Sequence, residues 1–144
     1  MTAVKHDVEK LLAEGQTIQL RVPTNSMYQF IRPNRDEVII APLENGYAIH
    51  RGDVVLYRRP QSILVLHRVY RVTNDSFFAV GDNQSEIEGP LPLTQLRGMM
   101  VAIKRGKHTI NADQPLYVLT SRLWLAMLPI RPIIWRFHRQ MRKE

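Results

Sequence analysis

The spacing of apolar residues changes along the chain and predicts a helix, then a series of strands, then a helical tail. Between residues 3 and 14 apolar side chains recur at helical spacing, and Gly15 follows where helices commonly stop. Residues 16–22 alternate apolar and polar side chains, which is the period of a half-buried strand, and Pro23 ends the alternation.

Short apolar runs separated by turn residues fill the middle of the chain. We expect strands at residues 37–41, 54–57, 63–72, 77–80, 97–104 and 108–110. Asn45-Gly46 indicates a turn, residues 58–62 a polar hairpin turn, and residues 85–93 a loop, since they contain Gly89-Pro90 and Pro92. This pattern predicts a mainly β fold, a partly open antiparallel coiled β-sheet with a short N-terminal helix and a C-terminal helical segment.

Three segments follow from this pattern: an N-terminal helix at 1–15, a β-domain at 16–112 and a helical tail at 113–144. Pro129 and Pro132 interrupt the tail, so we expect two helical pieces joined by a break. Tryptophan and arginine beside an apolar stripe are typical of a helix that lies in a membrane interface. Packing of the tail on its own domain, or on another subunit, is the alternative.

Composition changes this picture in two respects. The 144 residues carry a net charge of +7, and residues 116–144 hold six arginines and lysines against one acid, so the basic character belongs mainly to the tail. Such a tail favours an anionic partner, such as an acidic lipid surface or an acidic peptide. No nucleic acid is expected, because no recognition-helix pattern accompanies the charge. There is no cysteine and no paired ligand spacing, so we expect no metal and no cofactor.

No signal peptide and no membrane-spanning segment are expected. Residues 1–15 are charged and lack an apolar core segment, and no run of about 18 apolar residues follows. We therefore expect a location in the cytoplasm or at the inner surface of the membrane.

Candidate chemistry comes from a serine, a histidine and an acid that lie beside or within apolar runs. A serine hydroxyl becomes a useful nucleophile when a neighbouring base takes its proton. Histidine suits that task, and an acid can hold its ring in the correct tautomer. Ser26, His67 and Asp82 occur in that order.

Four short motifs around these residues resemble those of a known family. They read Thr24-Asn25-Ser26-Met27, Gly52-Asp53 before an apolar strand, His67-Arg68-Val69, and Gly81-Asp82-Asn83. In this order, over about residues 16 to 105, they resemble the signal peptidase superfamily of serine peptidases, which also holds the self-cleaving LexA-type repressors. His-Arg-Val is similar to the branch found in archaea and the endoplasmic reticulum, in which histidine is the base.

The resemblance implies a serine endopeptidase that removes a signal or leader peptide from a precursor. Ser26 would be the nucleophile and His67 the general base, with Asp82 or Glu88 orienting the imidazole. Thr24 and the Ser26 backbone N–H would hold the oxyanion. Residues Met27, Tyr28, Phe30 and Ile31 would line a substrate cleft or belong to the core.

Several alternatives stay open from the sequence. Asn25, Gln29 and Glu88 depart from the family pattern, which favours a catalytically inactive peptide-binding module that retains the fold. A self-cleaving repressor would need a lysine base and a DNA-binding domain, and neither is evident. Arg68 faces away from His67 on a strand and is expected to pair with an acid. A histidine base predicts that activity falls as pH drops through the histidine pKa, between about 8 and 5.

Overall fold

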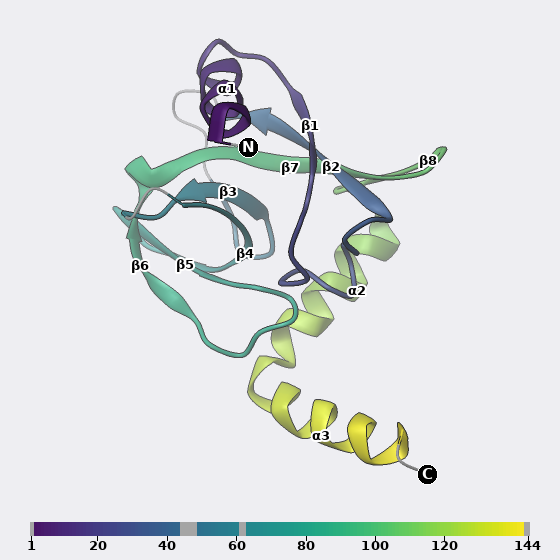
Figure 1. The fold of residues 1–144 in the computed structure, drawn as a ribbon. Coiled ribbons are helices and arrows are strands. Elements are labelled where there is room, and N and C mark those ends of the chain that lie inside the picture. Colours follow the sequence, from purple (N-terminus) through teal and green to yellow (C-terminus); the bar gives the residue numbers. More distant parts are fainter. Residues whose placement is uncertain (1, 44–48, 61–62, 143–144) are drawn as a thin grey trace.

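The computed structural model describes residues 2–43, 49–60 and 63–142. An antiparallel sheet curls around a small core, helix α1 covers it at one end, and a helical tail leaves from the other (Figure 1). The elements are α1 (Thr2–Ala13), β1 (Ile18–Arg21), β2 (Asp36–Pro42), β3 (Val54–Arg58), β4 (Leu64–Val72), β5 (Ser76–Val80), β6 (Glu88–Pro92), β7 (Leu96–Arg105), β8 (His108–Asn111), α2 (Pro115–Ala126) and α3 (Arg131–Arg142), with 3-10 turns at Leu93–Gln95 and Leu128–Ile130.

Strand β7 organises the sheet. It pairs with β2 along one edge, and along the other edge first with β3 and then with β8. The order β1-β2-β7-β3-β4-β5-β6 continues outward from it, and all pairs are antiparallel. The mainly β, open antiparallel fold predicted from the sequence is confirmed.

One predicted loop is wrong. Residues 85–93 were expected to lack regular structure because of their prolines, but Glu88–Pro92 forms β6, paired with β5. In this sheet β6 is the last strand of the path, and an edge strand tolerates proline since its outer side needs no ladder hydrogen bond. The predicted Asn45-Gly46 turn and the end of the 58–62 turn lie outside the described residues.

Strand β3 is buried on both faces and separates two apolar clusters. Val54 and Leu56 join the cluster that packs beneath α1, while Val55 and Tyr57 join a cluster on the opposite face with Phe77. Side chains alternate between the faces of a strand, so one short run serves both cores. These two cores fix the relative positions of β3, β4 and β5. Strand β3 carries Tyr57, β4 carries His67, and β5 leads into Gly81.

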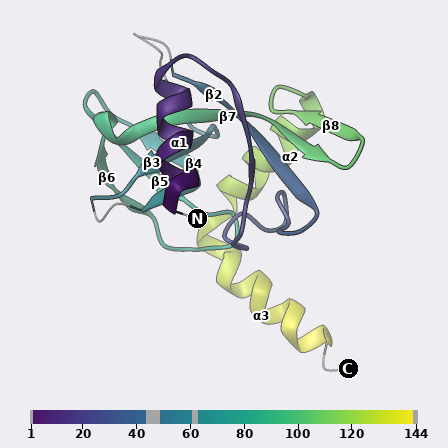
Figure 2. The same cartoon turned by 45° about the horizontal axis from the view of Figure 1, so that its top comes forward.

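The tail forms two helices, as predicted, with the 3-10 turn Leu128–Ile130 between them. One face of α2 packs on the sheet, where Leu125 and Leu128 contact Val80. Both ribbon views show α3 projecting away from the sheet (Figures 1 and 2). The tail is therefore held at its base and extended at its end.

Candidate functional site

Ser26 lies in the turn that follows β1, and buried neighbours hold this turn in place. Met27 and Ile31 are fully buried in the cluster beneath α1, and the Ile31 N–H donates to the Met27 carbonyl at 3.0 Å. Ser26 itself is half-buried, and its Oγ lies 3.3 Å from Oγ1 of Thr24. The burial of the flanking residues thus presents the Ser26 hydroxyl at the edge of the core.

The Gly81-Asp82-Asn83 segment lies directly against the Ser26 turn. The Asn83 N–H donates to the Ser26 carbonyl at 2.9 Å, and Nδ2 of Asn83 donates to the Asn25 carbonyl at 3.2 Å. A Cβ on Gly81 would lie 2.7 Å from the Ser26 carbonyl oxygen, closer than side chains approach backbone. Glycine is therefore required here by the close approach of two motifs that are 55 residues apart in the chain.

His67 lies on β4 with 4% of its surface exposed, at the wall of a cavity of about 600 Å³. The same cavity is lined by Arg59, Glu88, the loop at residues 83–87, and Trp135 from α3. Asn83 borders this cavity and also binds the Ser26 turn, so one residue connects the two candidate catalytic segments. Among the described residues no hydrogen bond joins the Ser26 hydroxyl to His67, although such bonds are often long before substrate binds.

Tyr57 determines which nitrogen of His67 carries the proton. The Tyr57 hydroxyl donates its single proton to Oε1 of Glu88, and its oxygen lies 3.3 Å from Nδ1 of His67. Toward His67 that oxygen can only accept, so Nδ1 is the protonated nitrogen. The second nitrogen, Nε2, then has the free lone pair that a general base needs.

Burial, together with the charge of Arg59, keeps His67 neutral. Burial, and then the nearby Arg59 guanidinium, lower the pKa of His67 to about 4. Burial and the Glu88 carboxylate raise the pKa of Tyr57 well above its usual value, so its hydroxyl keeps its proton. Partial burial alone would raise the pKa of Glu88, but hydrogen bonds from Tyr57 and Arg59 outweigh it and lower that pKa.

Asp82 is bound to Arg68, and within the described residues no hydrogen bond joins it to His67. Its Oδ1 and Oδ2 accept from Nε and Nη2 of Arg68 at 2.8 and 2.7 Å, with both side chains fully buried. The expectation that Arg68 pairs with an acid is confirmed. Asp82 is thus held by Arg68, and Glu88 is the carboxylate that hydrogen bonds connect to the imidazole, through Tyr57.

The residues expected to line a substrate cleft divide into two kinds. Met27 and Ile31 are fully buried and present no surface to a substrate, so the core reading applies to them. Tyr28 and Phe30 are half-buried, and Phe30 packs edge-on against Tyr117 of α2. Thr24 is exposed and lies beside the Ser26 hydroxyl, where a second oxyanion donor would be useful.

The base of the tail is fastened to the loop beside this cavity. Arg131 is fully buried and donates to the carbonyls of Gly81 and Gln84 at 3.1 and 2.8 Å. Trp124 donates from Nε1 to the Asp82 carbonyl at 2.7 Å, and its ring lies beside that of Trp135. The tail therefore supports the loop that contacts the Ser26 turn.

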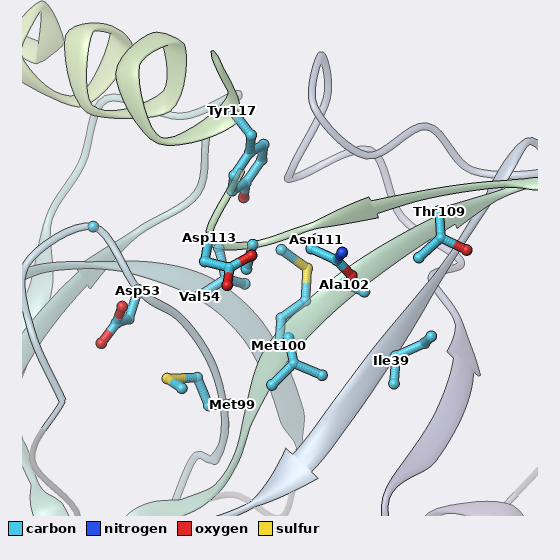
Figure 3. A pocket seen from close by; sticks show the side chains of 13 residues that line it. Ile39, Asp53, Val54, Met99, Met100, Ala102, Thr109, Asn111, Asp113 and Tyr117 are labelled. Atoms are coloured by element: carbon cyan, nitrogen blue, oxygen red, sulfur yellow. The ribbon is translucent and has the colours of Figure 1, made fainter. Parts of the chain in front are cut away.

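A second cavity, of about 500 Å³, lies where β3 and β8 diverge along the edge of β7 (Figure 3). Its floor is apolar, with Met100 at its centre, and Asp53, Asp113 and Tyr117 lie around it. Neither Ser26 nor His67 belongs to its lining. Ser26 is also not among the residues that line the cavity beside His67, which it reaches only through the hydrogen bond from Asn83.

Sequence reasoning missed Tyr57, Arg59 and Trp135. Tyr57 ends the apolar run 54–57 and resembles any core residue, and only its pairing opposite Val65 on β4, two residues from His67, places it near the imidazole. Trp135 was assigned to the apolar stripe of the tail. The motif resemblance named Glu88 as a candidate acid, and it did not reveal the tyrosine that lies between Glu88 and His67.

No protein-family model matches the chain, and no curated protein matches it. In the part of the chain that the structure describes, no three His, Asp or Glu side chains converge to hold a metal ion. The described helices also include none with the length and apolar character needed to cross a membrane. The fold is an open antiparallel β-sheet with a helical tail, and the site offers a hydroxyl, a neutral imidazole and a carboxylate in neighbouring segments.

Proposed function

We propose that the protein is a serine endopeptidase of signal-peptidase type, with Ser26 as nucleophile and His67 as general base. The observation that supports this most strongly is the hydrogen-bond chain from Glu88 through Tyr57 to Nδ1 of His67. It leaves Nε2 with a free lone pair, and His67 lines a cavity that is also lined by Asn83, which is hydrogen-bonded to the Ser26 turn.

The proposed reaction proceeds in two acyl-transfer steps. Oγ of Ser26 attacks the scissile carbonyl carbon while Nε2 of His67 takes the hydroxyl proton, and the carbonyl oxygen becomes an oxyanion. The Ser26 N–H and the Thr24 hydroxyl donate to that oxyanion. The imidazolium returns the proton to the leaving amine as the C–N bond breaks, and a water activated in the same way then hydrolyses the ester.

The substrate class proposed is a precursor protein or peptide with a signal or leader segment. This rests on the motif resemblance, and the structure adds only compatible features. The cavity beside His67 holds Ile87 and Trp135 next to Arg59 and Glu86, so it offers both apolar and charged contacts to an extended peptide.

A non-catalytic peptide-binding module is the second candidate. The observation that favours it is the absence, within the described residues, of a hydrogen bond between Ser26 and His67, together with the engagement of Asp82 by Arg68. Under this reading the cavity would bind a peptide without cleaving it.

A serine-directed phosphonate probe separates the two candidates. We expect covalent labelling at neutral pH, with the adduct mapped to Ser26 by mass spectrometry, because only an activated serine reacts with such probes. Ser85→Ala is the matched control. Ser85 lines the cavity beside His67, and its loss should leave labelling unchanged. An intact protein that stays unlabelled, or a label on Ser85, would contradict the peptidase proposal.

The pH dependence of cleavage gives a further prediction, which differs from the one drawn from the sequence. A pKa of about 4 keeps His67 neutral over the range in which an ordinary histidine titrates. We therefore expect kcat/KM to stay level from roughly pH 8 to pH 5 and to decline only near pH 4, as His67 becomes protonated. A decline centred near pH 6.5, the ordinary value for histidine, would show that His67 is not held neutral by its surroundings.

A further inference from the structure

The helical tail carries apolar side chains that the fold leaves uncovered. Among the described residues ten large hydrophobic side chains are exposed, and seven of them lie between positions 116 and 141. These seven are Leu116, Leu119, Leu123, Ile130, Ile133, Phe137 and Met141. A protein of this size seldom exposes so many apolar side chains on one segment without a binding partner.

Three of these seven side chains lie on one side of helix α3, and the other four lie on α2 and the 3-10 turn before α3. Ile133, Phe137 and Met141 recur every four residues, so they share a face, and their exposed fractions are 66%, 63% and 62%. Arg131 and Trp135, which contact the domain, project from other sides of the helix. The apolar face of α3 therefore points away from the protein to which its base is fastened.

The charges beside this face identify the partner. From residue 115 to residue 142 the chain holds arginines and no aspartate or glutamate. Arg136 and Arg139 are exposed on α3, and helical geometry puts Arg136 at the flank of the apolar face. A short helix with an apolar face, flanking arginines and no acidic residue has the composition of a segment that lies in the interface of an anionic membrane.

Other occupants fit less well. A second copy of the chain would bring arginines toward arginines, and α3 offers no acid to pair with them. Nucleic acid would use the arginines and leave Ile133, Phe137 and Met141 without a role.

We infer that α3 docks the protein on anionic lipid bilayers, with the face formed by Ile133, Phe137 and Met141 in the interface. Docking through α3 leaves the domain at the membrane surface, with Trp135 at the junction between the helix and the cavity beside His67. This inference does not depend on the peptidase proposal, because it concerns a surface that lies outside that cavity.

Vesicle flotation of the full chain tests the inference. We expect binding to vesicles of equal parts phosphatidylcholine and phosphatidylglycerol, weakening as salt is added, and little binding to phosphatidylcholine alone. The double variant Ile133→Ser/Phe137→Ser should bind the anionic vesicles on the order of a hundredfold more weakly, since two side chains no longer bury apolar surface. Arg136→Gln should weaken binding about fivefold.

The matched control is Ile63→Ser/Val72→Ser, which removes two exposed aliphatic side chains from the β-domain and should leave vesicle binding unchanged. Thermal unfolding of each variant shows that its fold is intact. Absence of binding to anionic vesicles, equal binding to neutral vesicles, or equal loss in the control would overturn the inference. Self-association abolished by Ile133→Ser/Phe137→Ser, in a protein that ignores vesicles, would assign the face to a second copy instead.

Discussion

Replacing Ser26 by alanine is expected to reduce peptide cleavage by at least about 10³-fold, because the residual rate rests on binding and oxyanion contacts alone. The change removes one oxygen from a half-buried side chain whose only side-chain hydrogen-bond partner, among the described residues, is Thr24. Stability should therefore change little, and the loss should appear in kcat with KM nearly unchanged. The measurement is cleavage of a precursor peptide followed by mass spectrometry.

Two comparisons show whether the loss comes from chemistry. The Ser85→Ala variant, changed in the cavity beside His67, should cleave the peptide at the wild-type rate. His67→Ala should be about as damaging as Ser26→Ala, and the double variant should be no worse than either single variant, since the nucleophile and its base act as a unit. Cleavage by Ser26→Ala at the wild-type rate would remove Ser26 from the mechanism, and additive losses would separate His67 from it.

Most of the fold could be predicted, because apolar residues recur at the spacing of a helix in some segments and at the spacing of a strand in others. The helical tail was recognisable for the same reason, and its break follows from Pro129 and Pro132. Strand β6 was missed since local turn residues outweighed the apolar signal of Leu91, which is buried against β5. The pairing of β6 with β5 depends on tertiary structure, which the local sequence does not show. Its prolines are tolerated because β6 lies at the edge of the sheet.

The candidate site could be predicted only in part. The order of the motifs predicted that Ser26, His67 and Gly81-Asp82-Asn83 lie close together. In the structure, hydrogen bonds from Asn83 join the last of these segments to the Ser26 turn. Strand alternation correctly turned Arg68 away from His67 and toward an acid. Sequence alone could not tell whether Asp82 or Glu88 is connected to His67. The answer depends on which acid pairs with Arg68, and on Tyr57, whose position in the sequence indicates only a core residue.

The contacts of Arg68 explain why Asp82 belongs to the framework of the site. Its guanidinium also donates to the Gly52 carbonyl at 2.9 Å and to the Tyr117 hydroxyl at 3.1 Å. One buried cation thus connects β4, the turn before β3, the Gly81 loop and helix α2. Gly52 has φ of 99°, a backbone conformation that glycine adopts readily, so its carbonyl reaches Arg68 without strain.

Asp82→Ala is accordingly expected to lower the free energy of unfolding by about 3–5 kcal/mol, because it leaves a fully buried arginine without its counter-ion. Burial alone would lower the pKa of Arg68, and the Asp82 carboxylate outweighs burial and raises it. Without Asp82 the guanidinium still keeps its charge, because arginine is not deprotonated in proteins. Urea unfolding of the two proteins at neutral pH measures the difference.

The double variant Arg68→Leu/Asp82→Leu removes both charges and should recover part of the loss. The control Asp75→Ala, at an exposed turn, should lower the free energy of unfolding by less than about 0.5 kcal/mol. A loss for Asp82→Ala as small as that of Asp75→Ala would mean that water reaches Arg68 and that the ion pair does not stabilise the fold.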